Sequence, residues 1–482
     1  MVFSAYLDPS QFIDGDQILV LNFGGLSEGW QMRVANTITI ILFSLMFIGC
    51  DNNNDNNNKD VALTPASDCL WIGPYIKENE SLNFGYLDTG AAYWIAIYNL
   101  PEDGSHITLE NQFPYSRYMS FTSYRVVGGV VDELTDREII PNNGATNPYV
   151  EGNPRKDPSR GYLYKVSLGD PPDDTGSNSN NILYDGAAKA GDPAVIIYRN
   201  YVPNTGTDAA GDVGLPRVTL NMADGTVLQG QDACDILHIN YTPPASLYPA
   251  DDYANLRGSS DPSLNPPVFR ASYTRDFQFQ CNFGGDCTNN PPRDNSGFPN
   301  ADAAYMYAFL SRQYGEVLVL RGRIPRTPAT LDGRDTVFKE AQLRYWSMCQ
   351  YEYYSQKVEA CLFDEQVKVN DDGFFTIVTS RSEDRPDNAQ DDCGVGFIPW
   401  SANGDGFGIV EGRESYADDG YLLVRNMLPA PDFMQAIQNT SVSGDEAAVL
   451  GEYLPKGRYF SKAEFESLGC NPWLVLPYDG ME

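Results

Sequence analysis

Four arginines stand in two short motifs that each occur twice, and these residues are the best suited in the chain to bind a charged group. They are Arg117, Arg199, Arg344 and Arg425. The tyrosines of the same motifs are Tyr118, Tyr198 and Tyr345. A guanidinium group offers a planar fork of donors that matches a carboxylate or a phosphate. These residues could therefore line a cleft for an acidic or sugar ligand. The structural alternative is that each arginine pairs with a local Asp and fixes a loop.

A loop of oxygen-bearing residues matches part of a calcium-binding pattern. Asn403 and Asp405 stand at its first and third positions, Gly408 at its sixth and Glu414 at its twelfth. Carboxylate and amide oxygens are the ligands that calcium prefers, but Phe407 occupies a position that should supply one. Helices are not expected on either side, so the pattern is not an EF-hand. A loose surface site for calcium is the one cofactor that the sequence suggests.

Nine cysteines make disulfide bonds the expected crosslinks of an exported protein. If Cys50 carries a lipid, an even number remains: Cys69, Cys234, Cys281, Cys287, Cys349, Cys361, Cys393 and Cys470. Eight cysteines support up to four disulfides. Cys281 and Cys287 could close a small loop, and Cys349 and Cys361 could flank a hairpin, while the other pairings stay open. Closely spaced Cys-x-x-Cys pairs do not occur in the sequence, which disfavours a cysteine metal site.

An apolar stretch near the N-terminus is typical of an export signal. Met32 and Arg33 precede a mostly apolar run from Ile38 to Gly49, and Cys50 follows directly. This order is similar to a bacterial lipoprotein signal, in which acyl chains on the cysteine anchor the protein to a membrane. The alternative is a short transmembrane anchor, although the run is shorter than the roughly 20 apolar residues that span a bilayer.

The order of motifs indicates an internal duplication. Arg344 follows Arg117 by 227 positions, and Arg425 follows Arg199 by 226 positions, each within the same local motif. An offset that holds over so many residues predicts two copies of one domain. The predicted organisation is a non-mature segment 1–31, a signal peptide 32–50, an Asn/Asp-rich tether 51–64, copy one at 65–220, a connector 221–269, copy two at 270–445 and a C-terminal extension 446–482.

Each copy is expected to consist of β-strands. Segments such as 107–113, 194–198 and 317–324 are rich in β-branched and other apolar residues, and turn-forming residues separate them. Helical periodicity is weak, and the clearest helix signal is the capping box from Ser461 to Glu464 in the extension. The sequence therefore predicts an all-β fold with minor helices, built as two tandem related antiparallel β-sandwich or jelly-roll domains.

The paired motifs resemble those of an uncharacterised bacterial envelope family. The resemblance rests on Arg-Tyr-x-Ser at Arg117 and Arg344, and on Arg-Asn-(Tyr or Met)-x-Pro at Arg199 and Arg425, and it covers most of residues 65–445. Members of that family carry tandem β-sandwich or jelly-roll domains of unknown function. The resemblance implies a fold and a location, and it brings no chemistry with it.

The excess of acidic residues limits the classes of partner that the protein can bind. The 482 residues include 65 Asp and Glu against 33 Lys and Arg, a net charge of −32, which argues against nucleic acid as a partner. We expect a lipid-anchored protein of the bacterial cell envelope, periplasmic or surface-exposed. Its expected role is binding or structural, with a glycan, a peptide or a partner protein as ligand. The alternative is an envelope hydrolase that cleaves glycans with paired carboxylates.

Overall fold

The computed structural model describes residues 69–172, 180–239, 248–293, 297–474 and 476–481. The predicted signal peptide, the lipidation site Cys50 and the tether lie outside these residues. The described residues form four β-sheets that pair into two sandwiches, which confirms the predicted all-β fold with two tandem sandwich domains. Among the described residues, none of the helices has the length and apolar character that crossing a membrane requires.

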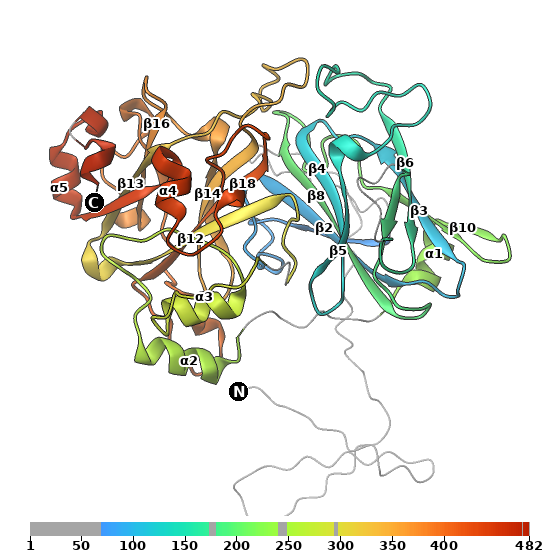
Figure 1. The fold of residues 1–482 in the computed structure, drawn as a ribbon, viewed down its shortest axis with the longest axis horizontal. Helices are drawn as coiled ribbons and strands as arrows, with labels where there is room; N and C mark the ends of the chain where they lie inside the picture. The colour runs from blue at the N-terminus through green and yellow to red at the C-terminus, as the bar shows by residue number, and fades with distance from the viewer. Residues whose placement is uncertain (1–68, 173–179, 240–247, 294–296, 475, 482) are drawn as a thin grey trace, which may run out of the picture. The chain divides into compact units, whose positions relative to one another are not determined.

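The first sandwich consists of two five-stranded sheets, drawn in blue to green in Figure 1. We call the first of them its facing sheet, with the strand order β1 (Trp71–Tyr75), β2 (Ala91–Asn99), β8 (Pro193–Pro203), β4 (Ser116–Tyr124) and β5 (Val130–Thr135). Its outer sheet has the order β10 (Val227–Gln229), β9 (Arg217–Asn221), β3 (His106–Gln112), β6 (Gly161–Ser167) and β7 (Ile182–Tyr184).

The second sandwich, drawn in yellow to red, has a similar plan with a five-stranded and a four-stranded sheet. Its facing sheet has the order β11 (Arg270–Ala271), β12 (Ala303–Ser311), β18 (Asp419–Pro429), β14 (Leu343–Tyr351) and β15 (Val358–Phe363). Its outer sheet has the order β17 (Gly396–Pro399), β16 (Phe374–Ser380), β13 (Val317–Arg323) and β19 (Lys456–Phe460). The strand β19 comes from the segment that the sequence assigned to a C-terminal extension.

The two facing sheets agree in register as well as in strand order. Arg199 of β8 lies opposite Ser120 of β4, and Arg425 of β18 lies opposite Ser347 of β14. In both outer sheets the pair at one edge is parallel, β6 with β7 and β16 with β17. The backbone φ is positive at Val202 and at the equivalent Leu428, a conformation that branched side chains rarely adopt. The repeated sequence motifs therefore mark a repeated structure.

The described residues form four hydrophobic clusters, and three of them fill the layers of the two sandwiches. One lies inside each sandwich, and a third is built from residues of both facing sheets, such as Tyr118, Tyr201, Tyr345 and Met427. In β3 only the residues that point to the sandwich core are fully buried, whereas every residue of β4 and of β14 is buried. Strands buried on both faces indicate that the two facing sheets pack against each other.

Short helices fill the connections. The connector carries α1 (Gly230–Leu237) and α2 (Ala250–Ser259), and α3 (Arg275–Asn282) follows β11. Near the C-terminus lie α4 (Glu446–Leu450) and α5 (Lys462–Ser467). The Ser461 hydroxyl accepts a hydrogen bond from the Glu464 N–H at the start of α5, which confirms the predicted capping box.

Candidate functional site

The four arginines of the repeated motifs lie in the contact between the two sandwiches. They belong to inner strands of the facing sheets, and their residues are at most 5% exposed: Arg117 on β4, Arg199 on β8, Arg344 on β14 and Arg425 on β18. A buried guanidinium group is tolerated where its donors and its charge find partners. The structure places these side chains inside the protein, in a contact layer rather than in an open cleft.

Two reciprocal ion pairs join the sandwiches. Arg117 of the first donates from Nη1 to Oδ1 of Asp364 at 2.5 Å, and Arg344 of the second donates from Nη1 to Oδ2 of Asp136 at 2.8 Å. The two aspartates are equivalent residues, because each begins a short 3-10 turn after an edge strand: η1 (Asp136–Glu138) and η3 (Asp364–Gln366). Burial raises the pKa of Asp136 to about 6, although Arg344 opposes the shift.

Each of these aspartates also holds its own sheet. The Asp136 carboxylate accepts a hydrogen bond from the Met119 N–H at 3.3 Å, and the Asp364 carboxylate accepts one from the Trp346 N–H at 3.0 Å. Met119 and Trp346 are equivalent residues of β4 and β14. Each of the two carboxylates therefore connects a strand of its own sandwich with an arginine of the other sandwich.

Tyrosine hydroxyls repeat the same reciprocal pattern. The Tyr118 hydroxyl donates to Oδ2 of Asp302, which lies on the loop before β12, at 2.7 Å. The hydroxyl of the equivalent Tyr345 donates to Oδ1 of Asp88, which lies on the loop before β2, at 2.8 Å. A second hydroxyl pair reaches carbonyl oxygens of the same two loops, from Tyr124 to Pro299 and from Tyr351 to Leu87. Each loop thus lies on the facing sheet of the other sandwich.

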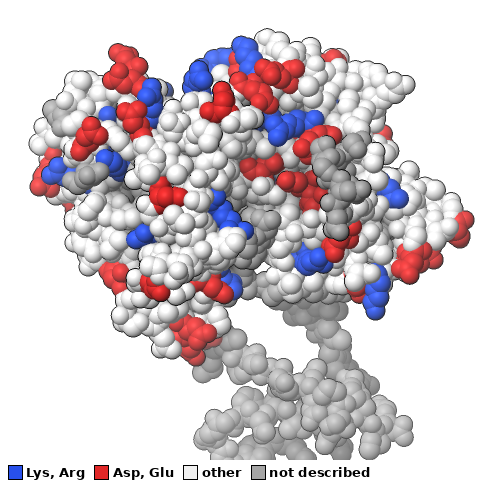
Figure 2. Space-filling view, viewed as in Figure 1, with Lys and Arg blue, Asp and Glu red and all other residues white. Residues whose placement is uncertain are grey.

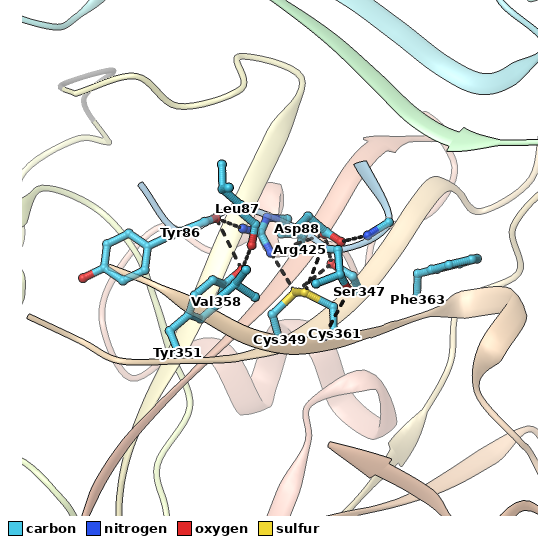
Figure 3. The surroundings of a disulfide bond; sticks show 12 residues. Tyr86, Leu87, Asp88, Ser347, Cys349, Tyr351, Val358, Cys361, Phe363 and Arg425 are labelled. Atoms are coloured by element: carbon cyan, nitrogen blue, oxygen red, sulfur yellow. Dashed lines mark hydrogen bonds and ion pairs between the residues drawn. A yellow bond between two sulfur atoms is a disulfide. The ribbon is translucent and has the colours of Figure 1, made fainter. Parts of the chain in front are cut away.

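A disulfide completes the polar cluster around Asp88, which Figure 3 shows. The Asp88 carboxylate accepts a hydrogen bond from Ser347 Oγ at 2.6 Å and pairs with Arg425 Nη1 at 3.3 Å. Arg425 also donates from Nη1 to Cys349 Sγ at 3.1 Å, and Cys349 is bonded to Cys361 across β14 and β15. Asp88 is 1% exposed, and the other residues of the cluster are at most 8% exposed, so the cluster is closed to solvent.

This cluster is also where a metal ion could be sought. Within the part of the chain that the structure describes, the one group of three close His, Cys, Asp or Glu ligand atoms is Asp88, Cys349 and Cys361, with the atoms within 4.8 Å of one another. Cysteine binds a metal ion as a thiolate, and here the two sulfur atoms are bonded to each other. The donors in this state do not fit a metal, and the carboxylate serves Arg425 instead.

The equivalent cluster of the other half contains an acid in place of the disulfide. Thr122 and Glu133 stand where Cys349 and Cys361 stand, opposite each other on β4 and β5. Burial and the neighbouring Asp302 raise the pKa of Glu133 to about 8, and burial also raises the pKa of Asp302. Atom Oε2 of Glu133 is buried without a hydrogen-bond partner.

These two carboxyl groups have the chemistry of an acid–base pair. A carboxyl group with a pKa near 8 holds its proton at neutral pH and can donate it. Arg199, whose charge opposes the rise in the pKa of Glu133, directs its donors to the Thr122 hydroxyl at 3.0 Å and the Tyr124 hydroxyl at 2.7 Å. The charge of Glu133 is therefore not neutralised by a direct ion pair with Arg199.

Tyr198 lies apart from the other predicted site residues. Successive residues of a strand point to opposite faces, so Tyr198 turns into the first sandwich while Arg199 turns to the interface. Its ring stacks on Trp94 and on Phe121, with centroids 5.4 and 4.9 Å away. The structure thus brings the four arginines, Tyr118 and Tyr345 to one interface and leaves Tyr198 in a core.

The acidic partners of the arginines were not singled out from the sequence. They are Asp88, Asp136, Asp364 and Glu365. A signal for two of them is present, because Asp136 follows Arg117 by 19 positions and Asp364 follows Arg344 by 20 positions. Repetition identifies such residues only when the two copies are compared position by position.

The predicted calcium ligands take part in a closed turn. Asp405 accepts hydrogen bonds from the Phe407 and Tyr416 N–H groups at 3.0 Å each and from the Tyr253 hydroxyl at 2.7 Å. Burial raises the pKa of Asp405 to about 6. The Asn403 amide donates to Glu352 Oε1 at 2.8 Å, and Glu414 is an exposed residue of the same loop. The geometry gives Asp405 a structural role in this turn.

All eight cysteines that the sequence proposed for disulfides are paired. The bonds are Cys69–Cys234, Cys281–Cys287, Cys349–Cys361 and Cys393–Cys470. The expected small loop and the expected hairpin are both confirmed. Four disulfides suggest a protein that folds outside the cytoplasm.

Two hollows on the described surface are open and polar. One, of about 480 Å³, is lined among others by Arg312, Tyr314, Asp418 and Glu464. A second, of about 370 Å³, lies between residues 326–342 and 430–435. On the face drawn in Figure 2, acidic and basic side chains are scattered among uncharged ones, without a continuous basic patch. A ligand at either hollow would meet a shallow surface.

Comparisons with known proteins gave matches among solved structures alone. Neither known families nor curated proteins gave a match to this chain. Among solved structures, an uncharacterised protein from Burkholderia cenocepacia is 13% identical with a TM-score of 0.43, covering 84% of this chain and 86% of its own. A structural-genomics target from Vibrio parahaemolyticus is 11% identical with a TM-score of 0.36, covering 78% and 90%.

Proposed function

We propose that this protein is a lipid-anchored binding or structural protein of the bacterial cell envelope, with a glycan, a peptide or a partner protein as its ligand. The proposal rests on the position of the repeated arginines, which lie between the two sandwiches. The repeated arginines hold the two sandwiches together, so they serve a rigid scaffold. A scaffold with open polar hollows suits the binding of an extended or bulky ligand better than the enclosure of a small substrate.

The location rests on two independent features. Four disulfides favour an oxidising compartment. The apolar run before Cys50 and the polar segment after it match a lipoprotein signal. Changing Cys50→Ser should move the protein from the membrane fraction to the soluble fraction after cell lysis, with the export of the chain unchanged. A Cys50→Ser protein that stays in the membrane fraction would contradict the lipid anchor.

Binding can be tested with glycan and peptide arrays probed with residues 60–482. The larger hollow offers Tyr314, a residue that is 37% exposed, beside Arg312, and aromatic rings with polar neighbours favour sugar and peptide contacts. Tyr314→Ala should weaken a hit at this hollow about tenfold, by the usual cost of truncating an aromatic anchor. Gln435→Ala in the other hollow is the matched control. Arrays without any reproducible hit would speak for a structural role.

A second candidate function is a glycan-directed hydrolase, and the pair Glu133 and Asp302 is the observation that favours it. A carboxyl group that holds its proton near a second carboxyl group is one requirement of acid–base cleavage. In that case Glu133→Gln should abolish release of sugars from a polymeric glycan, and the exposed change Glu110→Gln should leave it intact. If both variants release sugar at the rate of the unchanged protein, Glu133 has no catalytic role.

A further inference from the structure

The interface between the two sandwiches is self-complementary. Arg117 meets Asp364, and the equivalent Arg344 meets the equivalent Asp136. The same exchange holds for the tyrosine hydroxyls and the loops before β2 and β12. Interfaces in which one surface patch supplies both sides are the mark of two-fold symmetric dimers. The single chain therefore contains the interface of a dimer, closed between its own halves.

The residue after each paired aspartate differs between the two sandwiches. Arg117 contacts Glu365, the residue after Asp364, and Glu365 also accepts a hydrogen bond from the Leu331 N–H at 2.8 Å. In the first sandwich the residue after Asp136 is Arg137. Two first sandwiches would bring Arg117 toward Arg137 instead of Glu365, and like charges repel. The charges next to the paired aspartates therefore disfavour the pairing of two first sandwiches.

Within the described part of the chain, disulfide bonds do not join the first sandwich to the second. Each of the four disulfides joins cysteines on the same side of residues 240–247. The ion pairs, hydrogen bonds and apolar contacts between the sandwiches are all noncovalent. From Tyr248 onward the connector is attached to the second sandwich, where Tyr354 donates to the Tyr248 carbonyl and Arg257 pairs with Asp419.

We propose that this interface also forms between molecules, and that its partner is a second copy of this chain. In the exchanged dimer the first sandwich of each chain binds the second sandwich of the other, with the contacts seen here within one chain. Domain exchange of this kind needs no new contacts, because the native interface is reused twice. The partner surface is the same layer of buried arginines, aspartates and tyrosines.

The proposal can be tested with two cysteine substitutions in full-length chains. Pro154 of the first sandwich and Val337 of the second lie opposite each other in an isolated antiparallel bridge, flanked by the 3.0 Å hydrogen bond from the Phe338 N–H to the Asn153 carbonyl. Directly opposed residues of this type are close enough for a disulfide. One chain carries Pro154→Cys and a differently tagged chain carries Val337→Cys, and both are exported from the same cells.

The expected result is a disulfide-linked dimer that contains both tags on a non-reducing gel. Its yield should exceed that of two Pro154→Cys chains by roughly tenfold or more, because exchange holds the two different cysteines at a high effective concentration. A chain with both substitutions is the geometric control and should close its own bridge as a monomer. If this control closes its bridge and the mixed chains form no dimer above the Pro154→Cys pair, the proposal is overturned.

Discussion

Arginine is used in this protein mainly to hold backbone and loops in place. Besides the four at the interface, Arg155 donates to the Ser116 carbonyl, Arg160 to the Pro114 carbonyl and Arg293 to the Ile437 carbonyl, at 2.9 to 3.0 Å. The planar fork of donors reaches several carbonyl oxygens at once, which suits long loops between strands. At the scale of single residues, a repeated Arg-Tyr motif thus marks a structural joint as readily as a ligand site.

Removing one arginine of the interface should unfold the protein more easily. In Arg344→Ala, Asp136 would stay buried without its cation, and breaking a buried ion pair on one side costs about 3–5 kcal/mol. Chemical denaturation monitored by tryptophan fluorescence measures this loss. Arg217→Ala is the matched control, because its pair with Glu110 is exposed and is worth about 1 kcal/mol or less. Equal losses in the two variants would show that the buried pair does not stabilise the interface.

The protonated carboxyl of Glu133 makes stability depend on pH. Its pKa is about 8 in the folded protein against an ordinary value of 4.5, so unfolding releases a proton between these pH values. The stabilising effect of the neutral form is complete below pH 4.5 and is lost as the pH rises to 8. Glu133→Gln stays neutral in both states, so the variant should gain stability relative to the unchanged protein as the pH rises, reaching about 1 kcal/mol or more at pH 8.

Thermal unfolding of the two proteins at pH 5 and at pH 8 measures this difference. The exposed change Glu110→Gln should shift the melting temperature by the same small amount at both pH values. A Glu133→Gln variant with no greater advantage at pH 8 than at pH 5 would mean that this carboxyl is ionised in the folded protein.

At the scale of elements, the two outer sheets differ in what covers them. In the second sandwich, Val317 and Val319 of β13 are fully buried under the C-terminal segment, which includes Phe465. In the first sandwich the matching face of β3 carries Thr108 and Glu110, which are partly exposed. The alternation of β3 therefore predicts a solvent-facing sheet, and the unbroken apolar run of β13 predicts a covered one.

The Cys393–Cys470 disulfide should be important for keeping this cover in place. It closes a loop of 77 residues, and replacing both cysteines by serine should cost about 4 kcal/mol by the loss of chain restriction in the unfolded state. The double replacement of Cys281 and Cys287, which lie 6 residues apart, should cost about 2 kcal/mol and is the control. Melting temperatures and the rate of protease cleavage after Phe460 measure the effect. A larger loss for the short loop would contradict this reasoning.

At the scale of the whole molecule, the fold of each copy can be predicted from the sequence, but the contact between the two copies cannot. The repeated motifs and the alternation of strands such as β3 predict two sandwiches, and the count of cysteines predicts four disulfides. The partners of Arg117 and Arg344 lie more than 200 positions away, on the other copy, and no local pattern specifies them. The face on which Tyr198 lies depends on strand register, which a motif does not fix.

A cut in the connector tests how strongly the two halves hold each other. If a specific protease site is placed within residues 240–247 and cleaved, the two fragments should stay together, because a buried apolar core and reciprocal ion pairs join them. Size-exclusion chromatography should show one species with the mass of the intact chain, and denaturant should be needed to separate the fragments. Adding Arg117→Ala and Arg344→Ala to the cleaved protein should lower the denaturant concentration at which they separate. Fragments that elute apart under native conditions would show that the connector, rather than the interface, keeps the sandwiches paired.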